Sequence, residues 1–96
     1  MSECPQLDAL FHQPARTRIA LQLMGRGEVS FSELKSALSL TNGNLDAHLR
    51  KLAAAGYLTT RATSGPRPAT FYSFSPAGRD AFRAYLSALA LLLRQV

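Results

Sequence analysis

The sequence has few of the residues that carry out chemistry. It contains one cysteine, Cys4, two separated histidines and six scattered acidic residues. A single cysteine excludes an intramolecular disulfide and a metal cluster built on cysteines, and it fits a reducing cytosol. The histidines and acids have no spacing that predicts a nucleophile with its base, or a metal site. The sequence therefore predicts a protein that is not an enzyme and that holds no cofactor or metal.

Long apolar runs are also missing. The longest, Ala84–Leu93, is about half the length that a bilayer-spanning helix needs. Glu3, Cys4 and Pro5 interrupt any signal-peptide pattern at the start of the sequence. We therefore expect a cytoplasmic protein with no membrane partner. Its 96 residues, 47% of them hydrophobic, are enough for a single small domain over residues 1–96.

Negative charge is scarce in the second half of the chain. From Ala47 to Arg83 there are six basic residues against one acid, Asp80, whereas residues 1–46 carry four basic and five acidic residues. The formal net charge of +5 therefore comes from the second half. Such a positive field attracts polyanions, nucleic acids first among them. Charge alone fits a merely soluble basic protein equally well.

Capping residues predict the first two helices. Leu7–Phe11 is expected to form a helical turn, and Pro14 suits the first position of a helix that ends at Gly25 and Gly27. Ser30-Phe31-Ser32-Glu33 is a capping box, which predicts a short second helix through Leu38. The residues expected to form the apolar face of the first helix are Ala15, Ile19, Ala20, Leu21, Leu23 and Met24.

A third helix and a hairpin follow. Thr41 suits the N-cap of this helix, and Leu45, Leu49 and Leu52 give it one apolar stripe before Gly56 ends it. The next two segments are rich in aromatic and β-branched residues, and the stretch between them is rich in turn residues. We expect two strands and a loop of about six residues: Tyr57–Ala62, Ala69–Phe74 and, between them, Thr63–Pro68.

A long helix ends the chain, capped by Ser75 with Pro76 at its first position. The predicted order is helix, helix, turn, helix, strand, loop, strand, helix. This order predicts a mainly α fold with a small β-hairpin wing, the winged helix-turn-helix. Residues 14–74 would form its core, and residues 75–96 a terminal helix.

Several segments also carry a family resemblance: His12–Ile19, Phe31–Lys35, Leu40–Leu45, His48–Leu52, Ala55–Leu58 and Gly65–Arg79. They resemble the short MarR/ArsR-like winged helix DNA-binding domain family of prokaryotic transcriptional regulators, from about Leu7 to Leu93. The resemblance implies a DNA-binding regulator that dimerises through its terminal helices. Asp46 and Ala47 stand where the wider MarR pattern often has Ser-Arg. The metal sites of ArsR-type sensors rely on paired cysteines, which this sequence lacks, so the resemblance does not imply metal sensing here.

The candidate DNA contacts lie on the third helix and in the hairpin. Asn44 could bond an adenine edge, although asparagines also simply favour helix N-termini. Arg50 and Lys51 suit phosphates, and Arg67 between two prolines suits a minor groove, unless it only solubilises the loop. The full set is Thr41, Asn42, Gly43, Asn44, Ala47, Arg50, Lys51, Arg61 and Arg67. We expect Asp46 to pair with Arg50 rather than with a cytosine, and His48 to be a packed or capping side chain.

The terminal helix is apolar on more sides than its own domain can cover, which predicts a homodimer. The expected interface residues are Phe82, Tyr85, Leu86, Leu89, Leu92 and Leu93. Two copies would read an inverted repeat. The sequence thus predicts a sequence-specific regulator that binds double-stranded DNA, in the simplest case a repressor, with no effector that we can name. The alternative is a winged helix module that binds another protein.

Overall fold

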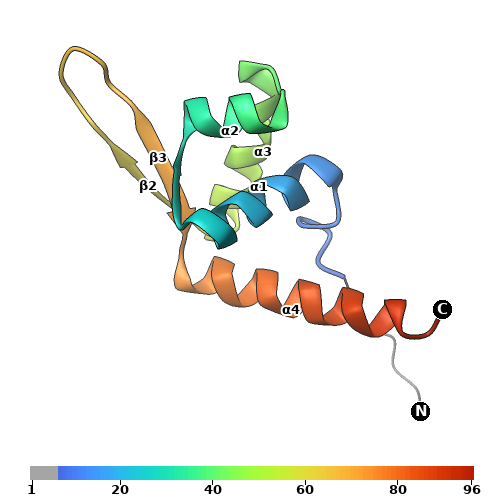
Figure 1. Ribbon diagram of the computed structural model, residues 1–96. Helices are drawn as coiled ribbons and strands as arrows, with labels where there is room; N and C mark the ends of the chain where they lie inside the picture. Colours follow the sequence, from blue (N-terminus) through green and yellow to red (C-terminus); the bar gives the residue numbers. More distant parts are fainter. Residues whose placement is uncertain (1–6) are drawn as a thin grey trace.

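The computed structural model describes residues 7–96, so Cys4 lies outside the part of the chain that it describes (Figure 1). The elements, in chain order, are α1 (Pro14–Arg26), β1 (Glu28–Ser30), α2 (Phe31–Leu38), α3 (Asn42–Ala54), β2 (Leu58–Ala62), β3 (Thr70–Phe74) and α4 (Pro76–Leu93). This order confirms the predicted winged helix-turn-helix. The turn over residues 9–11 that precedes α1 is present as expected.

Side-chain caps begin three of the helices where the sequence predicts them. The hydroxyls of Ser30, Thr41 and Ser75 accept hydrogen bonds from backbone N–H groups three residues later, at 3.1, 3.1 and 3.0 Å. Glu33 completes the capping box by accepting from the Ser30 N–H at 3.0 Å. That backbone hydrogen bond, the Ser30 hydroxyl and the Arg26 guanidinium lower the pKa of Glu33. The caps satisfy N–H groups that a helix start otherwise leaves unpaired.

The strands form one antiparallel sheet in the order β1-β3-β2. Each hairpin strand begins one residue later than predicted. The backbone of Tyr57 makes hydrogen bonds outside the hairpin. Its N–H donates to the carbonyl of Leu52 near the end of α3, and its carbonyl accepts from the N–H of Ser75 before α4. The β2–β3 hairpin projects beyond the helices as the wing, with residues 63–69 at its far end (Figure 1).

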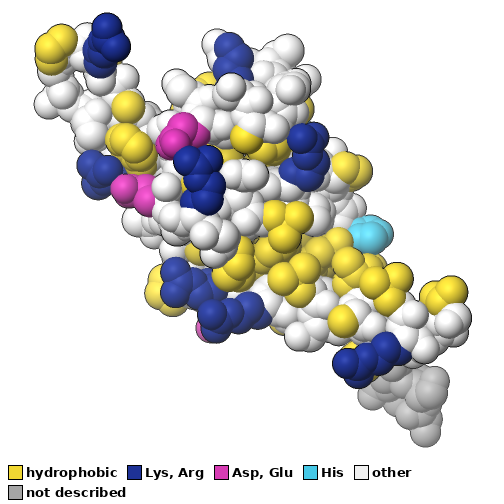
Figure 2. Space-filling model, in the orientation of Figure 1, with side chains coloured by type: hydrophobic (Ala, Val, Ile, Leu, Met, Phe, Trp, Pro, Cys, Tyr) yellow, Lys and Arg dark blue, Asp and Glu magenta, His cyan; other side chains and the backbone are white. Residues whose placement is uncertain are grey.

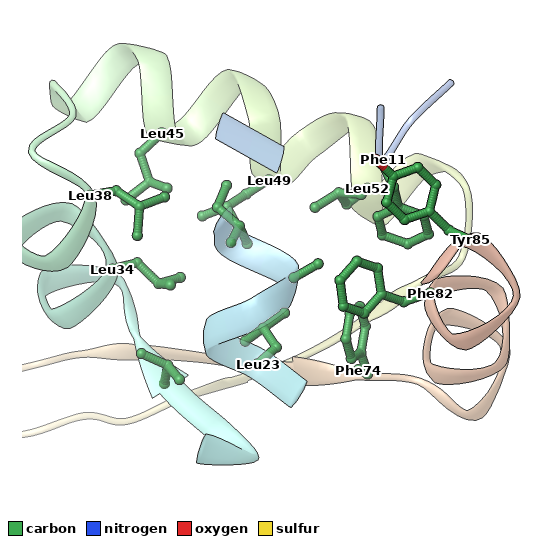
Figure 3. Close-up of a cluster of buried hydrophobic side chains, with 13 residues drawn as sticks. Phe11, Leu23, Leu34, Leu38, Leu45, Leu49, Leu52, Phe74, Phe82 and Tyr85 are labelled. Atoms are coloured by element: carbon green, nitrogen blue, oxygen red, sulfur yellow. The ribbon is translucent and has the colours of Figure 1, made fainter. Parts of the chain in front are cut away.

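The core surrounds α1 and is closed by aromatic rings (Figure 3). Phe11, in the turn before α1, is fully buried. Its ring stacks on Tyr57 at 5.4 Å between centroids and lies 5.0 Å from the ring of Phe82. The leucine stripe of α3 is buried as predicted. The prediction for Leu21 was wrong, because at 100° per residue it points away from buried Leu23 and is 51% exposed.

The two halves of α4 have different surroundings. Phe82 and Tyr85, in its first half, are 0% and 4% exposed within the domain's own core. Their expected place in a dimer interface is therefore wrong, because a second copy cannot reach them. The C-terminal end of the helix runs past the rest of the domain (Figure 1), and Leu91 and Leu93 are 46% and 65% exposed. Within residues 7–96, no helix has the length and apolarity required to span a membrane.

Candidate nucleic-acid interface

The first turn of α3 presents a polar surface. Thr41, Asn42, Gly43 and Asn44 are all exposed. The Thr41 hydroxyl accepts the N–H of Asn44, which leaves its own O–H free to donate to a ligand. A Cβ on Gly43 would have no heavy atom within 4 Å, so the packing of the domain does not require glycine there. Within residues 7–96, the side-chain amides of Asn42 and Asn44 make no hydrogen bond, so the fold itself does not use them.

The next turns of α3 carry the predicted cations. Ala47, Arg50 and Lys51 are exposed, on the side of the helix opposite the buried leucines. Nε of Arg50 donates to Oδ2 of Asp46 at 2.7 Å, so the predicted pairing is confirmed. The pair stands at a cleft of about 220 Å³ between α3 and the wing, lined by Asp46, Leu49, Arg50, Ala53, Thr60 and Tyr72. Burial and the Asp46 carboxylate raise the pKa of Tyr72.

His48 is packed between helices, as predicted. Arg16 of α1 lies with its Nη1 3.1 Å from Nδ1 of His48, and its Nε donates to the Leu10 carbonyl at 2.6 Å. Burial lowers the pKa of His48, and the charges of Arg16 and Lys51 lower it further. Arg16 thus joins the chain before α1 to α3. The sequence gives little sign of this role, because the two residues are 32 positions apart.

Arg67 lies in the exposed loop of the wing. Gly65 precedes it with φ of +113°, a left-handed conformation that glycine adopts at little cost. Figure 1 places this loop far from α3, so its arginine can reach a separate part of a long ligand. Figure 2 shows positive side chains both at the wing tip and over the helices.

Arg61 differs from the other candidates in its surroundings. Its Nε and Nη2 donate to the Glu28 carboxylate at 3.1 and 2.9 Å, and its guanidinium lies 4.5 Å from the centroid of the Phe71 ring. The hydrogen bond from Arg61 lowers the pKa of Glu28. Thr60 and Tyr72 face α3, so the alternation of side chains along a strand puts Arg61 on the opposite face of the sheet. Arg61 therefore braces β1 against β2, and the structure does not group it with the α3 residues.

A recess beside the α2–α3 turn escaped the sequence analysis. It has a volume of about 540 Å³ and is lined by Ser32, Lys35, Ser36, Ser39 and Leu40. Hydroxyls and an ammonium group next to the start of α3 are donors of the kind that contact phosphates. In the sequence, the serines and the lysine of α2 are the residues that could have indicated this recess. Within residues 7–96, no three histidines, cysteines or acids come together to hold a metal ion.

A three-stranded sheet with a projecting hairpin, and a helix-turn-helix with an exposed polar helix, define a winged helix domain. The sequence matches the winged helix DNA-binding domain family over residues 15–93, and the chain belongs to that family. A protein of Methanocaldococcus jannaschii, MJ0432, described as uncharacterised, is 32% identical over 88 residues, which cover 91% of this chain and 96% of the relative.

Solved structures give the same result. A transcriptional regulator homologue of Pyrococcus horikoshii OT3 superimposes with a TM-score of 0.81 at 32% identity, covering 90% of this chain and 86% of the other. Rv0081 of M. tuberculosis gives 0.73 at 31% identity, with 90% and 84% covered. The resemblance to winged helix regulators is therefore confirmed. The family and these likenesses also agree with the prediction that the protein is not an enzyme.

Proposed function

We propose that this protein is a transcriptional regulator that binds specific double-stranded DNA sites as a homodimer, with α3 in the major groove and the wing beside it. The observation that carries the proposal is the division of α3. Its leucines are buried, whereas its first turn and its cations are exposed on the other side. A recognition helix in a major groove needs this arrangement, with base-reading side chains near its N-terminus.

The roles of the residues follow from their positions. Asn42 and Asn44 would meet base edges, with Gly43 and Ala47 allowing a close approach of the helix to the groove. Thr41 and Lys51 would donate to phosphates that flank the site. Arg67, at the tip of the wing, would enter a minor groove or contact its phosphates. Arg61 keeps its bracing role and adds positive charge near the DNA only indirectly.

The second half of α4 supports a homodimer. Its apolar surface includes half-buried Leu86, Leu89 and Leu92 and the more exposed Leu93. No charged residue interrupts the sequence between Ala84 and Leu93, so two such helices can approach without like-charge repulsion. α4 lies on the opposite side of the domain from the wing tip and the α2–α3 turn (Figure 1), so both surfaces can be used together. A second copy of this helix is the partner that we propose.

Selection from random double-stranded DNA, read by sequencing, tests the function. We expect an enriched inverted repeat, since a two-fold dimer places two recognition helices about one DNA turn apart. The logarithm of the binding constant should fall with the logarithm of salt concentration, by about 0.9 for each phosphate contact. We propose that binding to such a site in the cytoplasm represses transcription, which a reporter gene tests.

The competing function is a winged helix module that binds another protein. Absence of binding to any DNA at low salt would favour it over DNA binding. The exposed asparagines of α3 and the arginine of the wing tip support DNA instead, since a module for protein partners has no need of cations at both places. Sedimentation at micromolar concentration without DNA tests the dimer separately. A monomer there would reject it.

A further inference from the structure

The ion pair between Asp46 and Arg50 leaves most of the arginine unused. The carboxylate holds the guanidinium at one atom, Nε, at 2.7 Å. A guanidinium has five N–H donors, four of which belong to its two Nη groups. Within residues 7–96, the Nη groups of Arg50 have no hydrogen-bond partner, and its side chain is 80% exposed. Arg50 is therefore anchored by its inner side while its outer edge stays free.

Arg61, which also has a carboxylate partner but lies on the face of the sheet opposite to α3, shows a different arrangement. Glu28 holds Arg61 at both Nε and Nη2, and the ring of Phe71 covers its plane. One edge of that guanidinium is therefore already hydrogen-bonded, and one of its faces is covered. Arg50 keeps the pair of Nη groups that can make two parallel hydrogen bonds to one partner. Its pair with Asp46 spans one turn of an exposed helix, and such pairs add little to stability.

The Asp46 carboxylate also changes which ligand Arg50 prefers. It offsets the charge of the arginine, and it repels phosphate oxygens that come near. A guanine edge in the major groove is uncharged and offers two acceptors, O6 and N7, at the spacing of a bidentate arginine contact. A held and partly neutralised guanidinium loses little attraction for such an edge. It also loses less rotamer entropy when it binds, because Asp46 already restricts it.

We propose that Asp46 is a positioning residue that makes Arg50 a reader of guanine instead of a phosphate contact. This inference rests on the proposed function, because it assigns a base to a residue of that same surface. It replaces the phosphate role that the sequence suggests for Arg50. It also gives a reason for a carboxylate on a helix that would enter a polyanion: Asp46 weakens binding to DNA in general and sharpens the choice among sites.

The test uses the full chain and the DNA site enriched by selection. Binding constants are measured over a range of salt concentrations for that site, for versions with each base pair changed, and for random DNA. The variants are Arg50→Ala, Asp46→Ala, Asp46→Asn and the double variant Asp46→Ala with Arg50→Ala. Asp80→Ala serves as the matched control, because it removes the same charge from an exposed position on α4. Thermal unfolding of each variant checks that the fold is kept.

We expect Arg50→Ala to abolish discrimination at one G·C pair. That loss should be about 5- to 150-fold, the range of one bidentate base contact, and Asp46→Ala should lose a smaller part of it at the same pair, because the arginine remains but is no longer held. Asp46→Ala should also strengthen binding to random DNA several-fold, with a salt slope steeper by about 0.9, because the released arginine can contact a phosphate. Asp46→Asn keeps an oxygen acceptor for Nε, so it should retain more of the discrimination. Asp80→Ala should leave discrimination unchanged.

Two results would overturn the inference. One is unchanged discrimination in Asp46→Ala. The other is an equal loss when Asp46→Ala is made in the Arg50→Ala background, because Asp46 would then act on the base without the arginine. Either result can occur while the wild-type protein still selects a DNA site, and the proposed function would then stand. A wild-type protein that binds no DNA would instead reject the proposed function, and this inference with it.

Discussion

Arg16 and His48 join the start of α1 to the middle of α3, with Nη1 of the arginine 3.1 Å from Nδ1 of the histidine. Nδ1 can accept only when it carries no proton, so this contact needs the neutral imidazole. Arg16 also donates to the Leu10 carbonyl at 2.6 Å, which fixes the segment that holds Phe11. The candidate recognition helix is thus attached to the core by a histidine whose pKa is lowered.

We predict that the stability of the protein falls as the pH drops below about 6.5, the ordinary pKa of histidine. Burial first, then Arg16 and Lys51, lower the pKa of His48 in the folded state. Between the two pKa values the unfolded chain binds more protons, so stability rises with pH in that window and is complete above it. Urea unfolding between pH 5 and 8 measures this, with His48→Gln as the comparison. Parallel curves for the two proteins would contradict the prediction.

Local sequence patterns determine the helix caps of this protein but not its long-range contacts. Ser30, Thr41 and Ser75 were predicted as caps because a cap depends on atoms within three residues. Arg16 with His48, and Glu28 with Arg61, are contacts across 32 and 33 positions, which depend on how the elements pack. The periodic spacing of residues along the sequence gives no sign of these two contacts.

The error on α4 has a related cause. A helix that is apolar on most sides shows that much of it must be buried, but not against what. The sequence therefore could not divide its residues between the domain's own core and a second copy. Phe82 and Tyr85 belong to the core because Phe11 packs against both rings, at 5.0 and 5.9 Å. The position of Phe11 is set by the turn before α1, which the sequence predicted without assigning its ring to the core.

We predict that Gly78→Ala destabilises the protein by about 1–3 kcal/mol, the usual cost of overpacking. A Cβ at this position would overlap the backbone carbonyl of Tyr57, and backbone cannot move aside as a flexible side chain can. Gly43→Ala is the matched control, since it adds the same group to a helix with nothing within 4 Å. Its melting temperature should stay the same or rise, because alanine favours helix. Equal losses in both variants would show that close packing at residue 78 is not the cause.

We predict that Arg67→Ala weakens binding to all DNA sequences alike and flattens the salt dependence by about one unit. The residue lies in the exposed wing loop, where it would meet phosphates or a minor groove. Arg83→Ala removes the same charge from an exposed position on α4 and should have a smaller effect on the slope. Titrations of random and selected DNA at several salt concentrations measure the binding constants and the salt slope of each variant. Equal slopes for the two variants would assign the effect to net charge alone.

We predict that Asn44→Ala costs about 1–3 kcal/mol at one base position and leaves binding to random DNA nearly intact. Its side chain is exposed, and its backbone N–H, which donates to the hydroxyl of Thr41, is kept in the variant. The loss should therefore come from the amide of the side chain and not from the helix start. Binding to a set of sites with single base changes measures it. An equal loss on every site would reject a base-reading role for Asn44.

We predict that Leu93→Glu converts the protein from dimer to monomer without unfolding it. Leu93 is 65% exposed on the projecting end of α4, so a charge there costs the isolated domain little, whereas at a helix–helix contact it would be buried. Leu21→Glu is the matched control, because Leu21 is 51% exposed on α1 and lies outside the proposed contact. Sedimentation should show a monomer for Leu93→Glu and a dimer for Leu21→Glu. The monomer should bind a single half-site as the wild type does, but lose the added affinity of the inverted repeat, since that gain comes from linking two recognition helices. If Leu93→Glu stays dimeric and Leu21→Glu becomes a monomer, the interface lies on α1 and not at the end of α4.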